Sequence, residues 1–151
     1  EATAVGKVCC SDEVIALLRQ GGVPKGDALG VARIAGIQAA KRTADLLPLA
    51  HPVAVHGVCV ELEVSEDGVD IRATVRTADR TGVEMEALTC VTVTALTLVD
   101  MMKGIDRIAG WAPVLARSKR GSPPRRCRAG LPRPVPNSGR AVDRHAGGAG
   151  P

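Results

Sequence analysis

Three short blocks of the sequence contain the side chains best suited to acid/base chemistry. Leu49-Ala50-His51 supplies an imidazole, Met85-Glu86 supplies a carboxylate, and Asp100 lies three residues before Lys103. General acid/base catalysis on an anionic substrate needs these residue types. The blocks therefore predict an enzyme that binds a small charged molecule, provided that the fold brings them into one site.

Two of the blocks also have an ordinary structural interpretation. A single histidine such as His51 is more often structural than functional, and His56 lies on an expected strand. Glu84 and Glu86 lie in the first turn of an expected helix, where acids favour the helix dipole. Glu84 can also close a capping box with Thr81. Taken alone, these acids favour a structural role.

The third block is the stronger functional candidate. Asp100 and Lys103 share one helical face and could form a plain surface ion pair. However, residues 91–99 carry no charge, which indicates a buried helix. Charges at the end of a buried helix need partners or a pocket. This argument favours a functional site at Asp100 and Lys103.

Additional cations flank the second expected helix. Lys25-Gly26-Asp27 places a cation and free backbone N–H groups at a helix start, which is a natural phosphate site, although a weak signal alone. Lys41 lies near the other end of the same helix. Both lysines are candidates for contact with an anionic substrate.

The spacing along the last expected helix points to an oligomer. Glu86 and Asp100 are 14 residues apart, which is about 21 Å at about 1.5 Å per residue. One small substrate cannot contact both within one chain. If both act, the simplest site combines the helix start of one chain with the helix end of another.

The apolar pattern predicts an α+β fold. Ser11 predicts a helix N-cap, Gly21 a helix end, and alternating residues the two middle strands. The expected elements are a strand over 2–8, helices over 12–20 and 27–44, strands over 54–64 and 69–76, and a helix over 82–105. A short candidate strand follows over 114–116. This order favours a ferredoxin-like antiparallel sheet with helices packed on one face over a doubly wound parallel sheet.

Charge and composition divide the chain into two parts. Residues 1–103 hold 10 Lys and Arg against 14 Asp and Glu, so the excess positive charge lies in the tail. We predict a catalytic domain over 1–111 and an Arg/Pro/Gly-rich, disordered tail over 112–151. The basic pI is therefore not a nucleic-acid signature of the domain, and the near absence of aromatic residues argues against base stacking.

Composition also bounds the cell compartment and the partners. No apolar run reaches the roughly 18 to 20 residues that span a bilayer, and no secretory signal is visible. No cysteine pattern typical of a metal site occurs, and no metal or cofactor is expected. An odd number of cysteines predicts reduced thiols in a cytoplasmic protein. They are Cys9, Cys10, Cys59, Cys90 and Cys127.

Longer blocks resemble one enzyme family. Residues 25–28, 32–43, 49–52, 81–88 and 96–103 resemble, in this order, the molybdenum cofactor biosynthesis protein C (MoaC) family, the cyclic pyranopterin monophosphate synthases. The resemblance covers about residues 2–106. It implies a ferredoxin-like subunit, dimers assembled into a hexamer, and active sites at the dimer interface.

The resemblance also implies the reaction and the residues. A GTP-derived cyclised intermediate, 3′,8-cyclo-7,8-dihydro-GTP, would be rearranged to cyclic pyranopterin monophosphate with release of pyrophosphate. Asp100 and Lys103 would be the central acid/base pair. The remaining residues would contact substrate or support the site: Leu49, Ala50, His51, Met85, Glu86, Lys25, Glu84 and Lys41.

The sequence departs from the family pattern in three places. Ala50 replaces a usual cysteine, and Val99 replaces a usual aromatic residue. About the first quarter of a typical member is missing, and the sequence after 106 loses the family pattern. Two alternatives follow: an inactive, truncated family member that acts only as an oligomer subunit, or a nucleic-acid binder that uses its basic tail.

Overall fold

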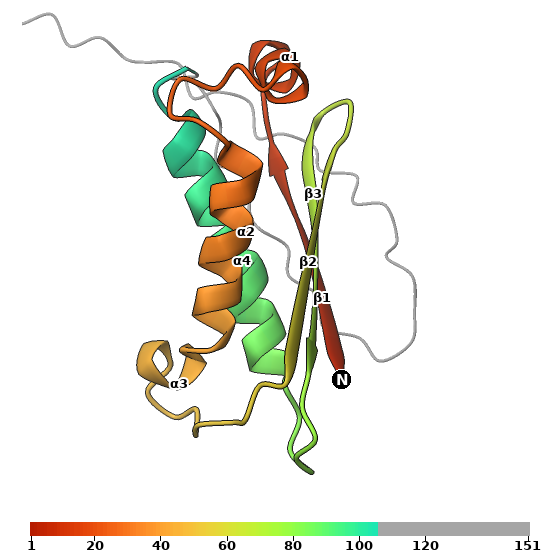
Figure 1. The fold of residues 1–151 in the computed structure, drawn as a ribbon, viewed down its shortest axis with the longest axis vertical. Helices are drawn as coiled ribbons and strands as arrows, with labels where there is room; N and C mark the ends of the chain where they lie inside the picture. The colour runs from red at the N-terminus through yellow and green to blue at the C-terminus, as the bar shows by residue number, and fades with distance from the viewer. Residues whose placement is uncertain (106–151) are drawn as a thin grey trace, which may run out of the picture.

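The computed structural model describes residues 1–105, drawn in colour in Figure 1. The possible strand over 114–116 and the domain boundary at 111 lie outside these residues. The elements, in chain order, are β1 (Ala2–Cys9), α1 (Asp12–Gln20), α2 (Ala28–Ala40), α3 (Thr43–Leu46), β2 (Gly57–Val64), β3 (Gly68–Arg76) and α4 (Glu84–Met102).

The three strands form one antiparallel sheet in the order β1-β3-β2. Helices α2 and α4 lie side by side on one face of this sheet (Figure 1). The α+β architecture with helices on one face confirms the fold class predicted from the sequence. The central position of β3 also explains its regular burial pattern.

Alternation along the strands separates the core from the outer face of the sheet, as predicted. Val69 and Ile71 on β3 are buried, while Arg72 between Ile71 and Ala73 is exposed. On the edge strand β2 only Val60 is buried. Arg72 pairs with Glu61 across the strands, with 3.8 Å between Nε and Oε2.

Helix α1 has both ends where the sequence places them. The Ser11 hydroxyl accepts a hydrogen bond from the Val14 N–H at 3.4 Å and so satisfies a free donor of the first turn. Gly21 ends the helix in the left-handed region at φ 66°.

The helix predicted over 27–44 is two helices. The start of α2 is where the sequence places it, with Asp27 as its N-cap. However, α2 ends at Ala40, and Arg42 has a non-helical backbone at φ −121° and ψ 21°. The buried Thr43 hydroxyl donates to the Ala40 carbonyl at 3.2 Å and takes up one of the last acceptors of α2. Thr43 is the first residue of the short helix α3 and packs against the end of α2.

The prediction of a capping box at the start of α4 is wrong. The N-cap is Val83, which is buried in the core and makes no side-chain cap hydrogen bond. The Glu84 carboxylate instead folds back over Gly82, where a Cβ added to the glycine would lie 2.0 Å from Oε2. Glycine at 82 therefore leaves room for this carboxylate at the head of α4.

A glycine also lets α2 and α4 approach closely. A Cβ on Gly36 would lie 2.0 Å from the Thr94 hydroxyl oxygen and 3.0 Å from the Cys90 carbonyl oxygen. The Ala- and Gly-rich sequence of α2 thus allows its close packing against α4. Burial in this contact raises the pKa of the Cys90 thiol to about 11, so this cysteine is a packing residue rather than a nucleophile.

Helix α4 is long and apolar enough to cross a membrane by length and composition. Half of it is buried within the domain, where it packs against α2, β1 and β3. Such burial is typical of the core helix of a globular protein. The uncharged stretch over residues 91–99 therefore contributes to the core, as predicted.

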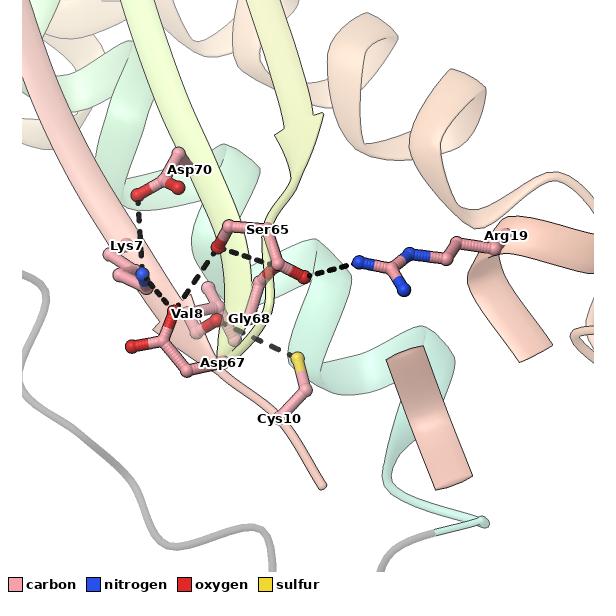
Figure 2. Close-up of polar contacts among 8 residues, drawn as sticks. All are labelled: Lys7, Val8, Cys10, Arg19, Ser65, Asp67, Gly68 and Asp70. Atoms are coloured by element: carbon pink, nitrogen blue, oxygen red, sulfur yellow. Dashed lines mark hydrogen bonds and ion pairs between the residues drawn. The ribbon is translucent and has the colours of Figure 1, made fainter. Parts of the chain in front are cut away.

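The turn between β2 and β3 is tied to β1 and α1 (Figure 2). Lys7 bonds to Asp67 and lies 3.6 Å from Asp70, and Arg19 donates to the Ser65 carbonyl at 3.1 Å. The hydrogen bond from Lys7 lowers the pKa of the Asp67 carboxyl. Gly68 is required here, since a Cβ would lie 2.1 Å from the Val8 carbonyl oxygen.

Candidate active site

Asp100 lies between two lysines at the C-terminal end of α4. Its Oδ1 is 2.6 Å from Lys103 Nζ, and its Oδ2 is 3.2 Å from Lys25 Nζ. Lys25 Nζ also donates to the Asp100 backbone carbonyl at 2.7 Å, where it satisfies a free acceptor of the last helical turn. The structure therefore brings together three predicted residues from sequence positions up to 78 apart.

The two lysines set the protonation state of this carboxylate. The hydrogen bond from Lys103, followed by that from Lys25, holds the pKa of Asp100 below its usual value. Asp100 is therefore a carboxylate at neutral pH with two ammonium groups in contact. Such a group can accept a proton from a substrate, and the lysines can neutralise developing negative charge.

Replacement of Lys25 by methionine is expected to raise the pKa of Asp100 toward its usual value, because one of two cationic donors is lost. A depressed pKa stabilises the fold above the unfolded-state pKa, and this contribution disappears as the pH falls through the folded value. The variant should lose part of it. Carboxyl NMR titration of the full chain measures the change, and Arg42→Met should leave Asp100 unaltered. An unchanged Asp100 titration in Lys25→Met would contradict the assignment.

The phosphate site predicted at the start of α2 is not free. The Asp27 carboxylate accepts from the Gly30 N–H at 2.8 Å and already supplies a negative charge at this helix terminus. Lys25 is directed toward Asp100 instead of standing beside the helix N-terminus. The structure thus keeps Lys25 as a candidate cation and removes the helix start as an anion site.

A second group of predicted residues lies at the opposite end of α4. Glu86 is buried, with 5% of its surface exposed, while Met85 beside it is 46% exposed. No hydrogen bond or ion pair to the Glu86 carboxylate occurs among residues 1–105, yet its oxygens retain contact with solvent. Because these oxygens are solvent-accessible and have no partner within residues 1–105, the Glu86 carboxylate is a candidate for binding a donor from outside this chain.

The loop after α3 carries the predicted histidine on the surface. Leu49 is 99% exposed, and His51 is exposed. Helix α3 contacts α4, so this loop belongs to the end of the domain where α4 begins (Figure 1). Lys41 caps the C-terminal end of α2 at the same end of the domain and is also exposed.

The predicted residues therefore form two groups rather than one site. Lys25, Asp100 and Lys103 are in contact at the end of α4. The other seven belong to the start of α4, or to the segments directly before and after α3, which lies beside the start of α4 (Figure 1). The 14-residue helical separation between Glu86 and Asp100 corresponds to about 21 Å. No single small substrate spans this distance within one chain.

Comparison with known proteins gives the family. The model of the MoaC family matches residues 1–121. The chain belongs to the MoaC family. The match extends 15 residues beyond Asp106, where sequence pattern alone lost the resemblance, and the matched part includes residues 118–121 of the basic segment.

Three similar proteins share the name cyclic pyranopterin monophosphate synthase. The chain is 58% identical over 123 residues to the cyclic pyranopterin monophosphate synthase of Nocardioides sp., a match of 80% of this chain and 76% of that protein. It is 61% identical over 120 residues to the synthase of Streptomyces griseus, with 80% and 68% covered. The synthase of Pelobacter propionicus is 52% identical over 108 residues, with 70% and 68% covered.

Sequence reasoning missed a set of contacts beside the second group of candidate residues. His56, assigned from the sequence to a strand, lies before β2, which begins at Gly57. It belongs to a hydrogen-bonded junction with Thr77 and Asp79. No motif signals this junction, because its partners are joined only by the hairpin of β2 and β3.

Proposed function

We propose that this chain is a cyclic pyranopterin monophosphate synthase of molybdenum cofactor biosynthesis. It converts 3′,8-cyclo-7,8-dihydro-GTP to cyclic pyranopterin monophosphate and releases pyrophosphate. Membership of the MoaC family supports the reaction class, and relatives that are 52 to 61% identical carry this name. The main structural support for the proposal is the Asp100 carboxylate, which lies between Lys25 and Lys103.

In this proposal Asp100 and Lys103 are the acid/base pair. The carboxylate accepts a proton from the substrate, and the ammonium group of Lys103 donates one or stabilises negative charge. Their direct contact at 2.6 Å favours a shared role, since the hydrogen bond from Lys103 lowers the pKa of Asp100 and keeps it a carboxylate until substrate arrives. Lys25 then binds the phosphates, for which it must exchange its contact with Asp100.

The second group of residues binds the rest of the substrate. Glu84 and Glu86 accept hydrogen bonds, Met85 supplies apolar contact, and Lys41 adds positive charge. The exposed loop residues complete this group of contacts: Leu49, Ala50 and His51. The Glu86 carboxylate supports the assignment, because it has no partner within residues 1–105 and can accept a hydrogen bond from the substrate or from a partner chain.

We further propose that the site forms between two copies of the chain in a dimer-built hexamer. The separation of Asp100 and Glu86 along α4 supports this arrangement. Exposed apolar side chains on the outer surface of the helical layer support it as well, because a partner could cover them. These side chains are Val31 and Ile34 on α2 and Leu96 on α4.

The proposed location is the cytoplasm. Cys59 is exposed and Cys90 is buried, and neither forms a disulfide in the described part of the chain. Free thiols are typical of proteins in reducing compartments.

Within residues 1–105, no three His, Cys, Asp or Glu side chains form a group that could hold a metal ion.

Turnover by the purified full chain tests the function. The chain is incubated with 3′,8-cyclo-7,8-dihydro-GTP, and both pyrophosphate and cyclic pyranopterin monophosphate are measured. The two products are expected in equal amounts. No product from a folded, oligomeric chain would refute the enzyme and favour the alternative of an inactive subunit.

A further inference from the structure

Two loops at one end of the domain are joined by side-chain hydrogen bonds. The first, here called the His51 loop, comprises residues 47–56 between α3 and β2, and the second, the β3–α4 loop, comprises residues 77–83. The Thr77 hydroxyl donates to the Ala54 carbonyl at 2.8 Å. In the other direction, the Ala54 N–H donates to Asp79 Oδ2 at 3.3 Å. Both backbone groups of Ala54 are therefore held by the β3–α4 loop.

Thr77 is the central residue of this junction. Its hydroxyl oxygen accepts from the Asp79 N–H at 3.0 Å while its proton goes to Ala54. One hydroxyl thus fixes the shape of its own loop and attaches the neighbouring loop to it. Removal of the hydroxyl breaks both hydrogen bonds at once.

His56 adds a second connection between the same loops. The Ala78 backbone nitrogen lies 3.2 Å from His56 Nδ1 and donates to it. The backbone N–H of His56 donates to the Arg76 carbonyl at 2.9 Å. Nδ1 also lies 3.0 Å from the Ala54 carbonyl oxygen. Because Thr77 already donates to that oxygen, the tautomer protonated on Nε2 satisfies all these groups, with Nδ1 accepting from Ala78.

Each loop leads directly to residues of the proposed substrate site. His51 lies three residues before Ala54, and Met85 and Glu86 lie six and seven residues after Asp79. The His51 loop is otherwise attached through Val53 and Val55, which pack half-buried against the core, whereas Leu49 and His51 are exposed. The junction is therefore the polar link that sets the position of His51 relative to the head of α4.

We infer that Thr77 is a positioning residue, whose hydroxyl holds the His51 loop against the β3–α4 loop so that both contact the same substrate. This inference rests on the proposed function, since it assigns Thr77 to the same site. Thr77 acts through His51 and does not itself contact the reacting atoms. Loss of its hydroxyl should weaken substrate and transition-state binding alike, which raises KM and leaves kcat nearly unchanged.

The test compares Thr77→Val with Thr77→Ser in the full chain. A neutral hydrogen bond contributes an equilibrium factor of about 2 to 12, so we expect KM to rise by about fivefold in Thr77→Val, with kcat within about twofold of the parent. Thr77→Ser keeps the hydroxyl and should restore KM. Thr3→Val, which removes a hydroxyl bonded to Thr74 on the outer face of the sheet, is the matched control and should not change KM.

A double-mutant cycle with His51→Ala shows whether Thr77 acts through the loop. If it does, Thr77→Val should raise KM much less in the His51→Ala background than in the parent. Equal effects in both backgrounds would overturn the inference. It would also be overturned by an unchanged KM in Thr77→Val, by no rescue with serine, or by the same KM rise in Thr3→Val.

Amide hydrogen exchange separates this inference from the proposed function. If the parent chain has no activity, the proposed function fails, and the role of Thr77 in the junction is judged by exchange alone. The Ala54 and Asp79 amides should then exchange faster in Thr77→Val and at the parent rate in Thr77→Ser. Unaltered exchange in Thr77→Val would refute the junction, whatever the activity.

Discussion

Asp100→Asn is expected to lower kcat by about 10²- to 10⁴-fold, the range that a positioned acid/base group contributes. Asparagine keeps the size of the side chain and one acceptor oxygen, but it cannot take up a proton from the substrate. It also loses the charge that pairs with Lys25 and Lys103. Single-turnover formation of cyclic pyranopterin monophosphate measures the chemical step directly.

The chain offers a matched control for this variant. Asp45 pairs with Arg42 at 3.2 Å with the same three-residue spacing as Asp100 and Lys103, and it is also exposed. Asp45→Asn therefore removes a comparable surface ion pair without touching the proposed site, and turnover should stay at the parent level. Retention of more than a tenth of the parent rate by Asp100→Asn would exclude Asp100 as the principal acid/base group.

Local signals in the sequence predicted the elements whose causes are local. Ser11 and Gly21 set the ends of α1, and both act through hydrogen bonds within a few residues. Alternation predicted β3 because a central strand buries every second side chain completely. On the edge strand β2 the same pattern gave the correct faces but overstated the burial.

The errors occurred where distant residues decide the local structure. Val83 heads α4 because its side chain fills the core, and the capping-box pattern of Thr81 and Glu84 contains no information about that packing. The break after Ala40 occurs where Thr43 is buried against the end of α2, and the sequence pattern contains no information about that packing. Neither position carries the glycine or proline that usually marks a helix boundary.

The candidate site was predictable as a set of residues but not as a geometry. Residue types and family resemblance singled out Asp100 and Lys103, and helical spacing alone predicted their contact. The contact of Lys25 with Asp100 spans 75 residues and requires the packing of α2 against α4. The junction at Thr77 spans 23 residues to Ala54 and has no periodic signature, so only the structure revealed it.

Two inactive variants are expected to regain activity when they are mixed within one oligomer. In the proposed site, one chain supplies the start of α4 with Glu86 and another supplies its end with Asp100. Random association of Glu86→Gln and Asp100→Asn chains should then leave roughly a quarter of the sites with both groups intact. Coexpression with two affinity tags, followed by turnover assays, measures the recovery.

The arrangement of the two groups provides an internal control. Asp100→Asn and Lys103→Met chains both damage the end of α4, so every site they form together contains one damaged group, and mixing should restore nothing. Recovery in the first pair and none in the second requires a site shared between chains. If tandem purification yields mixed oligomers and neither pair recovers, the two groups do not combine across chains. If no mixed oligomers form, the proposed assembly is wrong, and Glu86 must act at a distance of about 21 Å from Asp100 or not at all.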